Sequence, residues 1–436
     1  MLETLKEIML DFQESGLNIG TPRRLNIMPV KGKAAVCIGV RRCGKSTYMF
    51  QLIRKLLDKG VNRQNILYLN FFDDRLHALR HSGLGVITEA YYSLYPEKKN
   101  AETVYCFFDE IQTITGWEGF IDRIMRSERC VVYITGSSAQ LLSKEIATQM
   151  RGRALSWEMF PFSFSEFLGS KGLDAAAGPV SAKKRLLLQK AFNDFWECGG
   201  FPEVIGLEKH LRRGIHQEYF NAILFRDMVE RHDISHPKAV SELAHWLVDN
   251  AASTYTINKL TGYLQSLGYK VPKTSVAEYM AWFEDAYFLF TVRLFDASRR
   301  RSNANPKKIY CIDHSFVRSV SSGILLNSGH LLENLVFTAL RRTGGDVFYY
   351  RTNSGKEVDF ITVGPDGQRS LIQVCESLAD ANTKKREVAA LEEAMAESKL
   401  KAAVIVTRNE DEELASPAGK MKVLPAWRFL LNLRET

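Results

Sequence analysis

The 436-residue sequence lacks any uninterrupted apolar run near the roughly 18–20 residues that a membrane-spanning helix requires. It has only seven cysteines, an odd number, and no CxxC pair, which argues against a disulfide framework and favours a reducing compartment. The first residues (MLETLKEIMLDF) do not have the basic and then apolar layout of a signal peptide. Internal repeats and low-complexity tracts are also missing. These absences predict a soluble, cytoplasmic protein with no membrane partner.

A large excess of charge of one sign is missing as well. The 58 Lys and Arg residues face 50 Asp and Glu residues, so the formal net charge is +8. Such a balance permits a polyanionic partner without requiring one. The hydrophobic share of 45% and the charged share of 25% are ordinary for a globular chain, and the length predicts about two to four folding units.

Strand-like and helix-like runs alternate in the first part of the chain. Buried-strand patterns occupy residues 33–40, 65–72, 104–110, 129–138 and 154–163, and helical spacing lies between them. This alternation predicts an α/β fold, with a parallel sheet covered by helices on both faces.

The segment GVRRCGKS matches the phosphate-binding loop GxxxxGK[ST], with a strand before it and a helix after it. Glycines let successive backbone N–H groups face phosphates, and the helix N-terminus adds partial positive charge. Lys45 is expected to contact the β- and γ-phosphates, Ser46 to ligate Mg²⁺, and Thr47 to add contacts. The expected cofactors are therefore ATP and Mg²⁺. The expected nucleotide-binding residues are Gly39, Val40, Arg41, Arg42, Cys43, Gly44, Lys45, Ser46 and Thr47.

Two carboxylates, Asp109 and Glu110, follow the apolar run VYCFF. Ligands of α/β sheets bind at the carboxyl ends of the strands, so we expect Asp109 to hold Mg²⁺ and Glu110 to act as general base. Ser137 ends the next strand, where it could sense the γ-phosphate or simply cap a helix. Arg151 and Arg153 precede the fifth strand. Either could act as an arginine finger on a neighbouring subunit, or form a surface ion pair.

At this point the residues resemble a known family. The segments GVRRCGKST, FFDEIQTITGW, FPFSFSEFL, GGFPEVI and GKEVDFI are similar to AAA+ superfamily ATPases of prokaryotes that carry a C-terminal domain of unknown function. The resemblance implies an AAA-type core, a helical lid, a winged-helix-like module and a tail similar to the PD-(D/E)xK nuclease fold. It also favours Arg151 and Arg153 as finger residues.

Residues 256–290 have the pattern of a winged helix-turn-helix, with Lys273 and Thr274 at the start of the second helix. A basic segment with little acid follows, as backbone neutralisation of DNA requires. A protein contact for the module and a solvated linker for the segment are equally open readings. The candidate DNA-binding residues are Lys273, Thr274, Arg299, Arg300, Arg301, Lys307 and Lys308.

The tail carries Glu333 on an expected helix and Asp359 on an expected strand. Gln373 and Cys375 stand on the next strand, where the nuclease fold has a carboxylate and a lysine. An amide binds Mg²⁺ poorly and a thiol cannot replace the lysine, so nuclease activity is not expected.

The sequence thus predicts a Mg²⁺-dependent AAA+ ATPase that forms a homo-oligomer, with a hexameric ring as one form, and acts on DNA as a motor or remodeller. The alternative is a nucleotide-dependent switch in signalling or defence that uses ATP for assembly with slow turnover. The expected domains are the ATPase core (1–170), the helical lid (171–235), the winged-helix-like module (236–296), a basic linker (297–308) and the nuclease-like tail (309–436).

Overall fold

In the computed structural model the chain forms two compact units, Met1–Phe160 and Pro161–Thr436. The structure describes residues 1–79, 83–137, 150, 152–174, 180–323 and 327–433. Within those residues, no helix combines the length and the apolar character that a membrane crossing requires.

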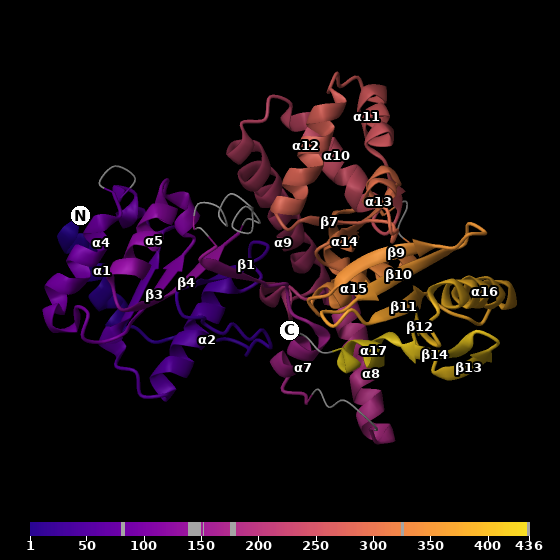
Figure 1. Ribbon diagram of the computed structural model, residues 1–436, viewed down its shortest axis with the longest axis horizontal. Helices are drawn as coiled ribbons and strands as arrows, with labels where there is room; N and C mark the ends of the chain where they lie inside the picture. The colour runs from indigo at the N-terminus through magenta and orange to yellow at the C-terminus, as the bar shows by residue number, and fades with distance from the viewer. Residues whose placement is uncertain (80–82, 138–149, 151, 175–179, 324–326, 434–436) are drawn as a thin grey trace. The chain divides into compact units, whose positions relative to one another are not determined.

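The first unit is built on a five-stranded parallel sheet with the order β2-β3-β4-β1-β5 (Figure 1). Its strands are β1 (Ala34–Ile38), β2 (Ile66–Asn70), β3 (Val104–Asp109), β4 (Cys130–Gly136) and β5 (Ala154–Glu158). All five residues of β1 are buried, as expected for a strand covered on both faces. The surrounding helices are α1 (Leu2–Glu14), α2 (Lys45–Asp58), α4 (Gly85–Leu94) and α5 (Trp117–Ser127). The α/β fold class predicted from the sequence is confirmed.

The strand order brings three functional segments to one edge of this sheet. Strand β4 lies between β1 and β3, with Ile38 opposite Gly136 and Asp109 opposite Thr135. Because parallel strands end at the same edge, the loop after β1, the acids after β3 and Ser137 after β4 come together there.

The second unit begins with helices. These are α7 (Phe164–Ser170), α8 (Ala182–Cys198), α9 (Lys209–Ala222), the π-helix η7 (Ile223–Glu230) and α10 (Pro237–Asp249). The capping box of Ser163 and Glu166 starts α7, since each side chain bonds the backbone N–H of the other.

A small antiparallel sheet follows, with the order β6-β8-β7. Its strands are β6 (Thr254–Tyr255), β7 (Leu289–Val292) and β8 (Lys307–Cys311), and the helices with it are α11 (Ile257–Ser266), α12 (Lys273–Asp285) and α13 (Arg299–Ala304). Figure 1 shows α10, α11 and α12 grouped at one end of this unit, with β7 and α13 nearby.

This sheet corrects two of the expected boundaries. Residues 297–308 do not form a plain linker, because they contain α13 and the first residues of β8. Residue 309 does not open the C-terminal α/β part, because β8 pairs with β6 and β7. The basic composition of the segment concealed a short helix, in which only Ser302 is buried, and the start of a strand in which Lys308 is buried.

The remaining chain forms a six-stranded mixed sheet with the order β13-β14-β12-β11-β10-β9. The strands are β9 (Asp346–Arg351), β10 (Glu357–Val363), β11 (Arg369–Val374), β12 (Ala402–Thr407), β13 (Glu412–Ser416) and β14 (Gly419–Pro425). The helices are α14 (His314–Val320), α15 (Ser328–Arg341), α16 (Ala381–Ser398) and α17 (Ala426–Asn432). Leu391 and Met395 of α16 pack with Ile361, Leu371 and Ile405 of the sheet in one apolar core.

Candidate nucleotide site and basic surface

The loop between β1 and α2 has the backbone of an anion-binding loop. Arg42 and Gly44 both adopt positive φ angles, 65° and 101°, and alternation of left- and right-handed residues turns successive N–H groups into one concavity. A Cβ on Gly39 would lie 2.0 Å from the carbonyl oxygen of Met159, so only glycine fits there.

Lys45 lies inside this loop and is 5% exposed. Its Nζ donates to the carbonyl oxygens of Gly39 (3.0 Å) and Val40 (3.1 Å) and is 3.7 Å from Oε1 of Glu110. Burial alone would lower the pKa of Lys45, but Cys43 and Glu110 outweigh it and raise the pKa above its usual value. The lysine is therefore held as a cation in a buried loop.

Ser46 lies beside Asp109, and its hydroxyl acts to lower the pKa of the aspartate. Asp109 is 1% exposed, and it also accepts hydrogen bonds from Thr135 and from the Tyr68 hydroxyl (3.1 Å). Burial raises the pKa of Asp109, although the hydrogen bonds from Ser46 and Thr135 act in the opposite direction. A buried carboxylate of this kind is stabilised in its ionised form by a cation.

Glu110 adopts a left-handed backbone conformation, with φ of 57°, which is uncommon for a residue other than glycine. Its N–H is held by the carbonyl oxygen and the hydroxyl of Thr135, both at 3.2 Å. Its Oε2 accepts a hydrogen bond from Gln112 at 2.5 Å. Strained backbone of this type persists where the surroundings fix it, typically at functional sites. Here it aims the Glu110 carboxylate toward Lys45.

Ser137 follows β4 and is 1% exposed, yet its hydroxyl has no hydrogen-bond partner among the described residues. A buried hydroxyl without a partner costs free energy, so it marks a place where an additional group belongs. Because β4 lies between β1 and β3, this group would lie at the edge that also carries Lys45 and Glu110.

The other loop residues support the same site. Cys43 is fully buried, and the Arg41 guanidinium lies 5.7 Å from the ring centre of Phe72. Thr47 lies in the first turn of α2, with its methyl group 3.0 Å from where a Cβ on Gly20 would be.

The two arginines before β5 are placed differently. Arg151 lies outside the described residues. Arg153 donates from Nη1 to Oδ1 of Asp122 on α5 at 2.9 Å, and Asp122 also pairs with Arg126. In this structure Arg153 thus forms the ion pair that the sequence left open as its alternative role.

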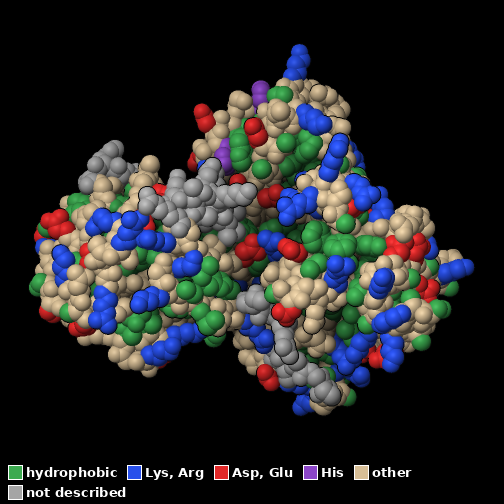
Figure 2. All heavy atoms as spheres, in the orientation of Figure 1, with side chains coloured by type: hydrophobic (Ala, Val, Ile, Leu, Met, Phe, Trp, Pro, Cys, Tyr) green, Lys and Arg blue, Asp and Glu red, His purple; other side chains and the backbone are tan. Residues whose placement is uncertain are grey.

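Several basic candidates gather around the three-stranded sheet of the second unit. A pocket of about 290 Å³ is lined by Lys273 of α12 and Lys307 of β8, together with Asn258, Asn303 and Asn305. Arg299, Arg300 and Arg301 are exposed on α13, Thr274 is exposed on α12, and Arg301 pairs with Asp296 at 3.2 Å. Figure 2 shows Lys and Arg side chains around the position that α13 has in Figure 1. The structure therefore brings the start of α12 and the basic segment to one surface.

Lys308 is a correction to the predicted DNA-binding set. It is 3% exposed, and its Nζ lies 2.9 Å from Glu333, 2.9 Å from Glu357 and 2.8 Å from Asp359. Burial would lower its pKa, but Asp359 and Glu333 raise it well above its usual value. An ammonium surrounded by three carboxylates inside the fold is not accessible to a DNA phosphate.

The residues around Lys308 extend the predicted tail site. Tyr310, two residues further on β8, donates to the same Glu333 oxygen at 2.7 Å. Burial, together with Asp359, raises the pKa of Glu333 to about 7. The sequence missed Lys308, Tyr310 and Glu357 as members of this cluster. Alternation along β8 was the available signal, because residues 308 and 310 share one face of a strand.

Gln373 and Cys375 are engaged elsewhere. The Gln373 amide donates to Glu387 at 2.7 Å and accepts from the Asp359 N–H at 3.2 Å. The Cys375 thiol donates to the Ser377 carbonyl oxygen at 2.9 Å, and burial raises its pKa to about 11. Among the described residues, no three His, Cys, Asp or Glu side chains form a group suited to a metal ion.

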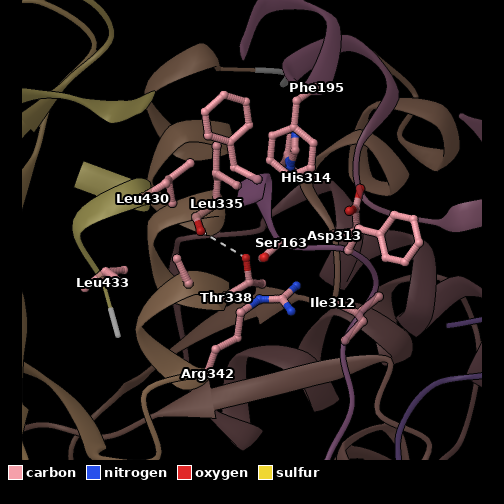
Figure 3. Close-up of a pocket in the computed structure, with 13 residues that line it drawn as sticks. Ser163, Phe195, Ile312, Asp313, His314, Leu335, Thr338, Arg342, Leu430 and Leu433 are labelled. Carbon is pink, nitrogen blue, oxygen red and sulfur yellow. Dashed lines mark hydrogen bonds between the residues drawn. The ribbon is translucent and has the colours of Figure 1, made fainter. Parts of the chain in front are cut away.

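A separate hollow in the second unit is lined by α7, α8, α14 and α15 (Figure 3). Its volume of about 20 Å³ is close to that of one water molecule. The Asp313 carboxylate beside it accepts from the N–H groups of Gly200 and Ser315, both at 2.8 Å. This hollow is part of the packing of the second unit and is too small for a nucleotide.

The loop, the strand order and the acids after β3 define the first unit as a P-loop nucleotide-binding domain of the AAA+ type. In agreement, the family model of the AAA domain matches residues 31–168. Two domains of unknown function, DUF8612 and DUF4143, match residues 189–325 and 328–429.

Two relatives match most of the chain. The uncharacterized protein MJ1544 of Methanocaldococcus jannaschii is 33% identical over 438 residues, which cover 98% of this chain and 95% of that protein. An uncharacterized protein of Haemophilus influenzae is 28% identical over 328 residues, covering 75% of this chain and 78% of that protein. The chain belongs to this family of AAA+ superfamily ATPases with C-terminal domains of unknown function.

Solved structures give weaker likenesses. The ORC1 protein of Aeropyrum pernix in complex with DNA is 14% identical with a TM-score of 0.30, covering 73% of this chain and 90% of that chain. The AMPPCP-bound DnaA of Aquifex aeolicus is 13% identical with a TM-score of 0.25, covering 65% of this chain and 86% of that chain. Likenesses at this level bear on neither activity nor partner.

Proposed function

We propose that this protein binds ATP with Mg²⁺ at the β1–α2 loop and hydrolyses it. The observation that carries the proposal is the convergence of a buried lysine, a serine–aspartate pair and a strained glutamate at one edge of the sheet. Lys45 is 3.7 Å from Glu110, and Ser46 lies beside Asp109 and acts on its pKa. The unpartnered hydroxyl of Ser137 is what a site built for a further polar group would leave.

Each side chain has a role that follows from its chemistry. Lys45 can exchange its two loop carbonyls for phosphate oxygens without losing hydrogen bonds. Ser46 and Asp109 supply the hard oxygen ligands that Mg²⁺ prefers. When bound, the ion neutralises phosphate charge. Glu110 accepts a proton from the attacking water, and Gln112 orients its carboxylate. Ser137 donates toward the terminal phosphate.

We further propose that the protein works as a homo-oligomer in which Arg151 reaches a neighbouring subunit's nucleotide. Arg153 was the second candidate for this role, but its guanidinium is held by Asp122 within its own subunit. A partly exposed ion pair of this kind typically contributes about 1 kcal/mol or less. We therefore assign Arg153 a structural role.

We also propose that DNA is the partner, bound at the backbone by the module that contains α10, α11, α12 and the β6-β8-β7 sheet. Its order of elements is that of a winged helix. Lys273, at the first position of α12, and Lys307 line one pocket, and three exposed arginines follow on α13. Clustered cations with only one paired acid in the segment, Asp296, favour phosphate contacts over base reading.

We do not propose that the tail cleaves DNA. Gln373 is bonded to Glu387, Cys375 is bonded to Ser377, and Lys308 fills the space between the carboxylates. The tail is then a structural or contact domain.

The test measures ATP binding and phosphate release for the wild type and for Lys45→Ala, with single-stranded, duplex and branched DNA. Lys45→Ala should lose ATP affinity, because no side-chain cation remains for the phosphates. Turnover of the wild type should rise with at least one DNA form. Slow turnover that no DNA form changes would favour the alternative function, a nucleotide-dependent switch. An ATP affinity of Lys45→Ala equal to that of the wild type would refute the proposed ATP site.

A further inference from the structure

The segment between α1 and β1, residues 15–33, has no helix or strand, yet it is fixed to the nucleotide-binding helix α2. The buried side chain of Gln51 donates to the carbonyl oxygens of Ile19 (2.6 Å) and Thr21 (2.7 Å) and accepts from the N–H of Arg23 (3.0 Å). Three hydrogen bonds to one buried amide hold this part of the chain in register with α2.

A second anchor lies one turn earlier on α2. The hydroxyl of Tyr48, which is fully buried, donates to Leu25 at 2.7 Å and accepts from the N–H of Ile27 at 3.1 Å. The backbone around residue 23 is therefore held by Gln51 on one side and by Tyr48 on the other. The whole segment up to residue 30 precedes the part of the chain that the AAA family model matches.

The side chain of Arg23 joins two carbonyl groups. Its Nη1 donates to Cys43 O in the phosphate-binding loop at 2.7 Å, and its Nη2 donates to Phe160 O at 2.6 Å. Phe160 is the last residue of the first unit. The planar guanidinium offers donors on two separate nitrogens at a fixed spacing, whereas a lysine carries all its donors on one atom, so lysine is not equivalent.

The carbonyl of Cys43 and the N–H of Gly44 belong to one peptide group. In a trans peptide these two bonds point in opposite directions, so a donor on the oxygen leaves the N–H free to face the phosphate concavity. A charged donor also polarises the peptide and makes its N–H a stronger donor. Arg23 thus acts on the loop from the side opposite the nucleotide.

We propose that Arg23 is a positioning residue for nucleotide binding, which holds the Cys43–Gly44 peptide with its N–H toward the phosphates and ties it to the end of the first unit. The inference rests on the proposed ATP site. The two guanidinium contacts that carry this role go to backbone carbonyls, Cys43 O and Phe160 O, and not to a reacting group, so they support bound ATP and the transition state equally. Its loss should therefore raise KM and leave kcat nearly unchanged.

The experiment measures nucleotide affinity with ATP and ADP, and steady-state turnover, for the wild type, Arg23→Met, Arg23→Lys and Lys45→Ala. Arg23→Met should weaken both nucleotides on the order of tenfold, as expected for one charge-assisted hydrogen bond. Arg23→Lys keeps the charge but has its donors on a single atom, so it cannot hold the two carbonyls with the geometry of the guanidinium, and should lie between the wild type and Arg23→Met. Turnover at saturating ATP should stay within about twofold of the wild type.

Two controls separate this role from general effects. Arg24→Met removes the same charge from the next residue, which is exposed, and should bind ATP like the wild type. Tyr48→Phe loosens the segment without removing the contact to Cys43, and its effect should be much smaller than that of Arg23→Met.

Wild-type affinity in Arg23→Met, or equal weakening in Tyr48→Phe, would overturn the proposal. If Arg23→Met does not fold, Arg23→Lys at an unchanged melting temperature decides: weaker binding supports the role and wild-type binding refutes it. Failure of the ATP site itself would be distinct, since the wild type and Lys45→Ala would then bind ATP equally.

Discussion

Replacing Lys308 by Met tests the buried cluster of the second unit. The ammonium lies 2.8–2.9 Å from carboxylate oxygens of Glu333, Glu357 and Asp359. Methionine fills a similar volume but leaves the carboxylates without their counter-charge. Removing one partner of a buried ion pair typically costs about 3–5 kcal/mol, far more than an exposed pair contributes. We expect a loss of this size in the free energy of opening around β8 and β10.

The loss should depend on pH because Glu333 can take up a proton. Its pKa is raised from 4.5 to about 7 in the folded state. Between these values the folded state binds more protons than the unfolded state, so the stability contributed by Glu333 falls as pH rises through this window. A protonated Glu333 needs no counter-charge, so the defect of Lys308→Met should be smaller below about pH 5 than above about pH 8.

Amide hydrogen exchange can localise the effect. Peptides from β8 and β10 should lose protection in Lys308→Met, whereas peptides from β1 and β3 in the first unit should keep wild-type rates. Lys307→Met is the matched control, because residue 307 is only partly buried and lies outside the cluster. Unchanged protection in Lys308→Met, or an equal loss in Lys307→Met, would refute the reasoning.

Three further predictions concern the ATP site and the basic surface. Ser137→Ala should keep the ATP affinity but lower the single-turnover rate of hydrolysis roughly tenfold or more, because one hydrogen-bond donor to the charge that develops on the terminal phosphate is lost. A rate equal to that of the wild type would mean that Ser137 has only a packing role. Arg151→Ala should bind ATP but hydrolyse it roughly a thousandfold more slowly. Its hydrolysis should recover in part when it is mixed with Lys45→Ala. Arg153→Ala should retain most of the wild-type turnover. Neutralising Arg299, Arg300 and Arg301 should flatten the slope of log affinity against log salt concentration on duplex DNA by up to about three units. The basal ATPase activity should not change. An unchanged slope would mean that DNA is bound at another surface.

The sequence predicted the first unit well because its signals are local. Apolar runs flanked by a glycine loop and by adjacent acids identify β1 and β3, and parallel pairing then brings Lys45 and Glu110 together. The positive φ angle of Glu110 and the unpartnered hydroxyl of Ser137 depend on the surrounding fold, so no pattern in the sequence announces them.

The second unit was harder to predict for a physical reason. Lys308 lies in a basic segment, and composition there predicts exposure, but its partners are 25 and 51 residues away along the chain. Only the folded structure shows that three carboxylates satisfy this charge. Arg23 is similar, since its acceptor Phe160 is 137 residues away. Ion pairs and hydrogen bonds between residues far apart in the chain produce no periodic pattern in a single sequence, so they cannot be predicted from it.

The most direct test of the central claim is the fate of ATP bound to Glu110→Gln. The amide keeps the shape of the side chain but cannot accept a proton from water. With Mg²⁺ present, the variant should bind ATP with wild-type affinity and release no phosphate, while the wild type turns over. Phosphate release by Glu110→Gln at the wild-type rate, or a wild type that binds no ATP, would contradict the account.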